Sequence, residues 1–229
     1  MEKKKILMAA LACILICVIS VAGTLAYLKD SSNNVKNTFI AQGKGKILDD
    51  NPDTQDEEGT FKIVESGVKK DDNGNYVIDS TASDVSKLDY EIVPGLSLAK
   101  KATIKITGKT TVPAYLYVEV VDKLTQGVYE NWSLESYWKK TTAAGPNGGT
   151  VYVYAPSGTE TAIAATDTEK YADKTFNIIA GDKLVVKSDV TDEKLKTVTG
   201  DTLEFYSYLA QKETFTDATA AFTACFAKK

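Results

Sequence analysis

Two short patterns in the chain combine a candidate nucleophile with a candidate base at the spacing of one helical turn. Ser66 and Lys69 form one Ser-x-x-Lys pair, and Ser97 and Lys100 form the other. Serine acyl-enzymes use this spacing because a helix places the two side chains one turn apart. Both pairs lie in sequence that is typical of strands, where residues three apart face opposite sides. We therefore assign no catalytic residue to either pair.

Two residue types that serve many active sites are missing, because the chain has no His and all 27 of its basic residues are Lys. Without His there is no Ser-His-Asp or Cys-His catalysis and no imidazole ligand for zinc. Without Arg there is no bidentate fork for phosphate or guanine. A net charge of −4 also opposes nucleic-acid binding, which needs a basic face. The composition predicts a folded protein without catalysis and without a cofactor.

Acidic residues gather in the segment 49–59, which holds six of them together with Pro52 and no apolar side chain. Carboxylate oxygens suit Ca²⁺, but the spacing of an EF-hand loop, with Gly at the sixth position and Glu at the twelfth, is absent. The same holds for the acidic run that begins at Asp71. We predict a hydrated loop at 49–59 and assign no metal ligand, with a calcium site as the alternative.

The elements that would position any site are mostly strands, because alternating apolar residues and β-branched residues dominate after the first 28 residues. In the stretch 113–122, Leu116, Val118 and Val120 share one face, which we expect to lie in the core. Tyr115 and Tyr117 share the other face with Glu119 and Val121. These tyrosines, with Tyr152 and Tyr154, could stack on bases or sugars, but we attribute them to cross-strand packing.

Further short runs with strand character predict an all-β fold, a jelly-roll-like antiparallel β-sandwich. The runs are Thr60 to Val64, Tyr76 to Asp79, Tyr90 to Val93, Ala102 to Ile106, Val151 to Tyr154, Phe176 to Ile179, Lys183 to Lys187 and Leu203 to Leu209. Asn and Gly in the segments 72–75 and 145–149 indicate turns between them. An Ala-rich run after Asp217 predicts a short helix near the C-terminus, at about 217–227.

The N-terminus has the organisation of an export signal. Three lysines at 3–5 precede an uncharged apolar stretch at 6–28. Small residues at its end predict cleavage after Ala26, which makes Tyr27 the first residue of the mature chain and 1–26 a signal peptide. The stretch is also long enough for an uncleaved membrane anchor, and its two cysteines raise lipidation as a third reading. The mature chain keeps 24 Lys, 30 acidic residues and one cysteine, Cys225, so it cannot form an internal disulfide.

Two stretches at this end resemble a known family. They are Gly23-Thr24-Leu25-Ala26-Tyr27-Leu28-Lys29-Asp30 and Asn37-Thr38-Phe39-Ile40-Ala41-Gln42-Gly43. Both are similar to the signature of the TasA/camelysin-like family, whose members are exported with a SipW-type signal peptide. The resemblance implies a secreted jelly-roll protein of a Gram-positive bacterium, found in the biofilm matrix or at the cell surface. The signal peptidase and either a second copy or a related matrix protein would be its partners.

In the fibre-forming branch of that family, the mature N-terminal segment supplies a strand to the neighbouring subunit. The resemblance thus implies an assembly segment at 27–43, followed by a sandwich domain at 44–229. Four alternating residues of the segment would face one side as it adds to an open sheet edge, with Phe39 and Ala41 filling a groove on the neighbour. These strand-donor residues are Val35, Asn37, Phe39 and Ala41.

Three functions follow from these observations. The first is a secreted structural subunit that assembles by strand addition, without catalysis. The second is an exported binding module for an unidentified ligand. The third is a camelysin-like metallo-endopeptidase, which the family name suggests but which the absence of His opposes, because zinc peptidases need imidazole or thiolate ligands. In all three, the membrane is contacted only through the signal segment of the precursor.

Overall fold

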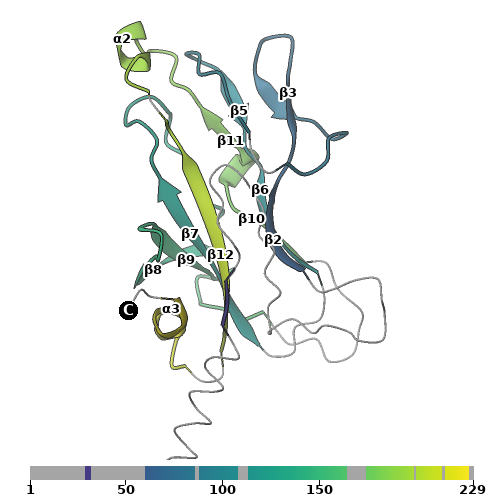
Figure 1. Cartoon of the computed structure of the whole chain (residues 1–229), viewed down its shortest axis with the longest axis vertical. Helices are drawn as coiled ribbons and strands as arrows, with labels where there is room; N and C mark the ends of the chain where they lie inside the picture. The colour runs from purple at the N-terminus through teal and green to yellow at the C-terminus, as the bar shows by residue number, and fades with distance from the viewer. Residues whose placement is uncertain are drawn as a thin grey trace, which may run out of the picture.

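Most of the regular secondary structure in the described residues is β-strand, and the strands form three sheets arranged as a β-sandwich (Figure 1). The structure, a computed structural model, describes residues 29–31, 60–85, 88–107, 113–163, 174–198, 200–212 and 215–226. The predicted all-β antiparallel sandwich is confirmed. The predicted signal peptide at 1–26 and the predicted acidic loop at 49–59 lie outside the described residues.

The largest sheet has five strands in the order β1-β12-β7-β9-β8, and every neighbouring pair is antiparallel. Its strands are β1 (Lys29–Ser31), β7 (Ala114–Asp122), β8 (Trp138–Ala144), β9 (Thr150–Tyr154) and β12 (Leu203–Gln211). Strands β7 and β12 pair along their whole length, from Leu203 opposite Asp122 to Gln211 opposite Ala114. These two strands therefore form the most extensively paired part of the large sheet.

Two smaller sheets form the rest of the sandwich. The three-stranded sheet has the order β10-β6-β2, and the four-stranded sheet has the order β11-β5-β4-β3. Their strands are β2 (Thr60–Glu65), β3 (Val68–Lys70), β4 (Tyr76–Ile78), β5 (Ser97–Ala99), β6 (Ala102–Thr107), β10 (Lys174–Asn177) and β11 (Lys183–Val185). The chain passes from one small sheet to the other between β2 and β3 and again between β5 and β6. These two connections run beside each other, since Ser66 donates a backbone hydrogen bond to Lys101.

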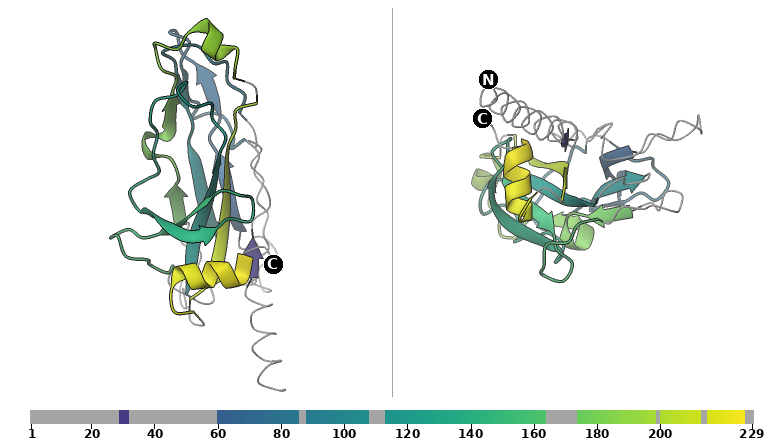
Figure 2. Two further views of the ribbon diagram at one scale, coloured as in Figure 1. Left: turned by 90° about the vertical axis from the view of Figure 1, so that its left-hand side faces the viewer. Right: turned by 90° about the horizontal axis from the view of Figure 1, so that it is seen from below.

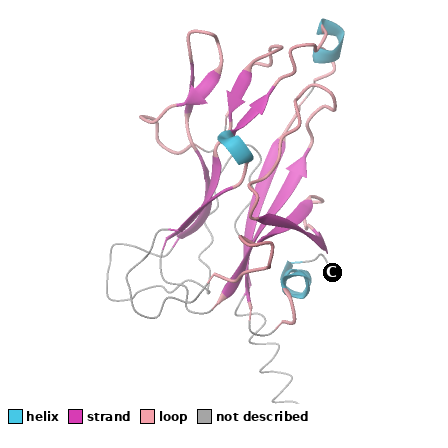
Figure 3. Ribbon diagram, turned by 180° about the vertical axis from the view of Figure 1, so that it is seen from behind, coloured by secondary structure: helices cyan, strands magenta, loops and turns pink. Residues whose placement is uncertain are grey.

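The helical segments are short, and the two α-helices lie near opposite ends of the sandwich (Figure 3). A 3₁₀ turn, η1 (Ala180–Asp182), precedes β11, and α2 (Asp192–Leu195) precedes β12. The predicted C-terminal helix is confirmed as α3 (Ala218–Phe226), and Asp217 caps it, because its Oδ1 accepts a hydrogen bond from the Ala220 backbone N–H at 2.8 Å. None of the helices described has the length and apolarity that crossing a bilayer requires.

The two long strands of the large sheet, β7 and β12, are buried on both faces. Leu116, Val118 and Val120 lie in the cluster between the sheets, which confirms the predicted core face of β7. The opposite face, with Tyr115 and Tyr117, is buried as well, in a second cluster beneath α3. Figure 2 shows this helix lying across the outer face of the sheet. A strand that is covered on both sides has no face toward solvent. Its alternating side chains therefore enter two different hydrophobic cores.

Some predicted strands differ from those observed. The run Tyr90 to Val93 is irregular, because the Glu91 backbone N–H donates to the Tyr76 hydroxyl at 2.9 Å and has no strand neighbour to pair with. Strand β8 was not expected, since its sequence does not alternate and its pairing with β9 shifts register between Lys140 and Ala144. The two predicted turns are present, at the β3–β4 and β8–β9 connections, where Gly74 and Gly148 both have φ of +81°.

Candidate functional site

The outer edge of β12 pairs with β1, the first strand that the structure describes. Strand β1 pairs antiparallel with the last part of β12, with Lys29 opposite Ala210 and Ser31 opposite Tyr208. Of the nine residues of β12, three pair with β1 on that side. An outer strand of this kind can template the pairing of another strand.

Helix α3 forms one wall of this edge. It contacts β12, β8 and β1, so it covers the outer face of the sheet next to the seat of β1 (Figure 2). Phe222 packs edge-on against Tyr117 and Tyr208, with ring centroids 5.0 and 5.2 Å away. Phe226 packs against Tyr208 at 4.9 Å. Aromatic pairs of this geometry add to the apolar area that the helix buries.

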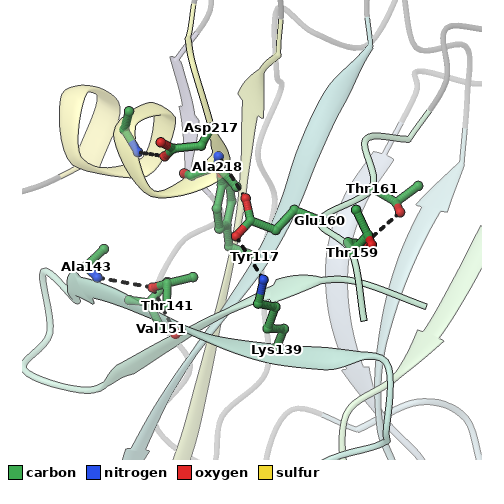
Figure 4. A network of polar contacts seen from close by, with 11 residues as sticks. Tyr117, Lys139, Thr141, Ala143, Val151, Thr159, Glu160, Thr161, Asp217 and Ala218 are labelled. Carbon is green, nitrogen blue, oxygen red and sulfur yellow. Dashed lines mark hydrogen bonds and ion pairs between the residues drawn. The ribbon is translucent and has the colours of Figure 1, made fainter. Parts of the chain in front are cut away.

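The first turn of α3 is fixed by polar contacts from two strands and a loop (Figure 4). The buried Tyr117 hydroxyl donates to the Ala218 carbonyl at 2.7 Å, and the Ala218 N–H donates to Glu160 Oε2 at 3.2 Å. The other oxygen of Glu160 lies 3.5 Å from Lys139 Nζ on β8. Burial raises the pKa of Tyr117, so its hydroxyl stays neutral and can donate. The helix is thus attached to β7, to β8 and to the loop that carries Glu160.

A second carboxylate lies in β12 itself. Glu204 is buried, and its Oε2 accepts a hydrogen bond from the Tyr206 hydroxyl at 2.8 Å. Its Oε1 accepts from the Thr202 hydroxyl at 3.2 Å and lies 3.6 Å from Lys123 Nζ. Burial and the Glu204 contact raise the pKa of Tyr206. The first half of β12 therefore carries a buried negative group beside a buried aromatic one.

Glu119 lies at the centre of the sheet and is fully buried. Its Oε1 accepts from the backbone N–H groups of Asn147 and Gly149, both at 2.9 Å. Its Oε2 accepts from the Asn147 amide at 3.0 Å and from the Tyr208 hydroxyl at 2.6 Å. With four donors, the carboxylate is satisfied, and it fastens the β8–β9 turn to β7 and β12. This arrangement stabilises the sheet. Both carboxylate oxygens of Glu119 already accept hydrogen bonds, so neither is available to a ligand.

A buried ion pair lies where the two small sheets meet. Lys100 Nζ is 2.5 Å from Glu65 Oε1, with the two side chains 2% and 0% exposed. The second oxygen, Oε2, is also buried and accepts no hydrogen bond from the described part of the chain. Burial raises the pKa of Glu65, and the neighbouring ammonium opposes that rise. Lys100 also lines a cavity of about 310 Å³.

Among the predicted site residues, none falls within the described part of the chain. The cleavage residues Ala26 and Tyr27 and the strand-donor residues Val35, Asn37, Phe39 and Ala41 all lie outside it. The structure does place Lys29 to Ser31 of the predicted assembly segment, against β12. Within the described ranges, no group of three or more His, Cys, Asp or Glu side chains is placed to hold a metal ion.

Sequence reasoning missed the three buried acidic groups, Glu65, Glu119 and Glu204, and the buried lysine. Glu119 had a signal, because a single acid on the aromatic face of an otherwise apolar strand needs donors if that face is covered. Gly145 and Gly149 were the second part of this sequence signal, because a Cβ at either position would collide with the Glu119 side chain. In the sequence, Lys100 stood out only as part of a Ser-x-x-Lys pattern. In the structure, Lys100 forms the ion pair with Glu65, which does not involve Ser97.

Comparison with known proteins adds no relative to this description: no protein-family model matches the chain, and no curated protein and no solved structure matches it.

Proposed function

We propose that this chain is an exported structural subunit that assembles by β-strand addition, with the outer edge of β12 as the acceptor. One observation carries the proposal: a strand from the N-terminal segment already lies on that edge and covers three of its nine residues. The export-type N-terminus and the resemblance to the TasA/camelysin-like family support it. The proposal assigns no catalysis and makes the matrix or the cell surface the site of action.

The exchange of strands between copies has a simple energetic basis. A strand that leaves its own β12 and pairs with the β12 of a neighbour makes the same contacts, so the exchange costs little. The ladder hydrogen bonds between the donor strand and the neighbour's β12 then hold the two copies together. Extending the register from Ser31 opposite Tyr208 by five residues brings Lys36 opposite Leu203, at the start of β12. The donor would thus fill the edge.

Cleavage explains when exchange begins. The predicted cut after Ala26 lies three residues before Lys29, where β1 starts. Before the cut, the strand continues into the apolar segment that the membrane holds. After the cut, Tyr27 is free, and the strand can move to a neighbouring copy. Assembly would therefore follow export.

The register also refines the set of strand-donor residues. On the same extension, Val35 lies opposite Glu204, whereas Asn37, Phe39 and Ala41 fall beyond the start of β12. Directly opposed like charges destabilise a strand pair. We expect Val35→Asp to slow fibre growth, and Val35→Lys to leave it unchanged. Equal growth of the two variants would contradict this register.

Site-specific cross-linking tests the proposal directly. One chain carries Lys29→Cys and a second carries Ala210→Cys, both in a Cys225→Ala background, because antiparallel neighbours lie within disulfide reach. Strand exchange predicts a disulfide-linked dimer between the two chains after mixing and oxidation. The matched control replaces Ala210→Cys by Glu193→Cys on α2, at the other end of the domain (Figure 1).

Two further results would contradict the proposal. The first is a double variant, Lys29→Cys with Ala210→Cys, that cross-links only within single chains while fibres are present. The second is the persistence of fibres, seen by electron microscopy, after deletion of residues 27–42. Casein cleavage that disappears with a chelator would instead favour the peptidase reading.

A further inference from the structure

Two turns of the domain share one backbone hydrogen bond and one pair of residues. In the β3–β4 turn, the Gly74 N–H donates to the carbonyl three residues earlier in the chain at 3.0 Å, and in the β8–β9 turn the Gly148 N–H does the same at 3.0 Å. Both glycines have φ of +81°. Each follows an asparagine, Asn73 in the first turn and Asn147 in the second. The molecule thus contains two Asn-Gly pairs in matching turns.

An Asn-Gly pair can lose ammonia from its side chain without an enzyme. The backbone nitrogen of the glycine attacks the side-chain carbonyl carbon Cγ of the asparagine, and a cyclic succinimide forms as the amide nitrogen leaves as ammonia, taking the proton of the glycine N–H. Water then opens either side of the ring and gives aspartate or isoaspartate. Glycine favours the first step because it has no Cβ to block the approach. Asparagine is accordingly among the thermolabile residues.

The attacking nitrogen and the water are equally available in the two turns. Each glycine N–H is the donor of a 3.0 Å turn hydrogen bond, which must break before the nitrogen attacks. Water reaches both sites, because Asn73 and Asn147 are both exposed. A difference in reactivity between the two pairs must therefore come from the contacts of the asparagine side chains.

The side chain of Asn147 is held by two groups of the large sheet. Its amide nitrogen donates to Glu119 Oε2 and to the Tyr208 hydroxyl, both at 3.0 Å. These partners are 0% and 3% exposed, so the sheet fixes their positions. Ammonia can depart only if the amide nitrogen gives up both acceptors, and one of them is a charged group. The contacts therefore oppose succinimide formation at Asn147.

The side chain of Asn73 is not held in this way. Within the described ranges its side-chain amide makes no hydrogen bond, while its backbone N–H donates to Asp71 Oδ1 at 2.9 Å. The same carboxylate accepts from the backbone N–H and the side-chain amide of Asn75, at 2.8 and 3.2 Å. Asp71 thus orders the backbone of the turn and leaves the Asn73 amide able to rotate toward Gly74.

We propose that Asn73 is a site of spontaneous deamidation, whereas the contacts with Glu119 and Tyr208 keep Asn147 in its amide form. This modification site goes beyond the assembly function, and neither proposal depends on the other. Conversion at 73 adds one negative charge to an acidic turn. Because the lost ammonia does not return, the converted fraction of an exported chain records the age of that chain.

The reaction would have different consequences at the two positions. Isoaspartate at 73 would lengthen the backbone of an exposed turn. Aspartate at 147 would place a carboxylate against Glu119 Oε2, where an amide N–H now donates at 3.0 Å. Two carboxylates at that distance repel each other, and the buried one would lose a donor. The protected pair is therefore the one whose conversion would damage the sheet.

Peptide mapping by mass spectrometry of the full exported chain tests the inference. The chain is kept at mildly alkaline pH, folded in one sample and unfolded in urea in the other, and is cleaved after lysine at intervals. Residues 73 and 147 then lie in separate peptides, 71–87 and 141–170. The exchange of NH₂ for OH raises the peptide mass, and fragmentation assigns the converted residue.

In the folded chain, we expect Asn147 to convert about ten- to a hundredfold more slowly than Asn73, the factor for one lost hydrogen bond to a charged group. In urea, we expect similar rates, because the contacts of the fold are gone and glycine follows both residues. Comparable rates in the folded chain, faster conversion at Asn147, or a folded ratio that persists in urea would overturn the protection. An Asn73 that converts only in urea would overturn the site.

One variant tests the share of the tyrosine. Tyr208→Phe removes one acceptor of the Asn147 amide and leaves Glu119 in place. We expect conversion at 147 to rise about two- to tenfold, the factor for one neutral hydrogen bond, with no change at 73. Tyr152→Phe is the matched control and is expected to change neither rate. An unchanged rate at 147 in Tyr208→Phe would overturn the role of Tyr208. If that variant does not fold, the comparison of folded and unfolded samples decides.

Discussion

The Tyr208 hydroxyl donates a 2.6 Å hydrogen bond to Glu119 Oε2, and this contact joins the two longest strands of the sheet at its centre. The two residues lie on β12 and β7, and the same carboxylate accepts three further hydrogen bonds from the β8–β9 turn. Burial, reinforced by this contact, raises the pKa of Tyr208, so the hydroxyl remains a donor. One acidic group therefore connects four strands of the large sheet.

Removing that hydroxyl should destabilise the fold. Tyr208→Phe is expected to lower the free energy of unfolding by about 1.5–3 kcal/mol, the usual worth of a hydrogen bond to a charged group. Urea denaturation measures the change. Tyr152→Phe is the matched control, because the Tyr152 hydroxyl has no hydrogen bond within the described ranges. Equal losses for the two variants would show that the Glu119 contact adds nothing.

Two neighbouring glycines of the β8–β9 turn should respond differently to alanine. A Cβ at Gly149 would lie 2.5 Å from the Val120 carbonyl oxygen and 2.8 Å from Glu119 Cγ, and backbone cannot move aside. A Cβ at Gly148 would meet nothing within 4 Å, so only its φ of +81° is unfavourable. We expect Gly148→Ala to cost about 1 kcal/mol and Gly149→Ala to cost several-fold more. Thermal unfolding of both variants compares them.

The buried ion pair should respond to the loss of one partner more than to the loss of both. Lys100→Met leaves the Glu65 carboxylate buried without its cation, which is expected to cost about 3–5 kcal/mol. Adding Glu65→Gln should recover much of that loss. Lys105→Met is the control, because its partner Asp84 at 2.7 Å is 41% exposed, and such pairs contribute about 0–1 kcal/mol. A Lys100→Met loss no larger than the control would contradict the assignment.

The β3–β4 turn should show a measurable pH dependence. The Asn75 side chain, with the backbone N–H groups of Asn75 and Asn73, lowers the pKa of Asp71 below its ordinary value of 3.8. The folded state therefore binds its proton more weakly than the unfolded state. The resulting stabilisation is present above pH 3.8 and is lost as the pH falls through the lowered pKa.

NMR titration of the Asp71 carboxyl tests this shift. We expect Asn75→Ala to raise the measured pKa, because the largest contribution comes from the Asn75 side chain. Asn73→Ala keeps its backbone donor and is expected to leave the pKa unchanged. A titration of Asp71 at or above 3.8 in the unmodified chain would contradict the turn geometry.

The fold class followed from the sequence because strand alternation is a local property. The run 113–122 identified β7, and the Asn-Gly and Gly-Gly turns identified two hairpins. Strand β8 was not predictable, since an edge strand with a register shift is determined by its partner β9 and not by its own pattern. The run Tyr90 to Val93 had strand character, but a tyrosine hydroxyl occupies the backbone donor that a ladder would need.

The buried polar groups depend on contacts between residues far apart in sequence. Lys100 and Glu65 are 35 positions apart, and Glu119 and Tyr208 are 89 apart. A single sequence shows neither pairing, because Lys and Glu are ordinarily solvated and only the packing of three sheets excludes water here. Local patterns therefore predicted the strands, and the position of charge inside the sandwich could come only from the tertiary structure.

Helix α3 and strand β1 lie together at one end of the domain, and α2 lies at the opposite end (Figure 2). This difference between the two ends of the domain decides where a label can be attached without disturbing strand exchange. A purification tag fused after Phe226 would stand beside the acceptor edge and would compete with an incoming strand. A fluorophore at Glu193 on α2 would instead report on growing fibres from a position that strand exchange does not involve.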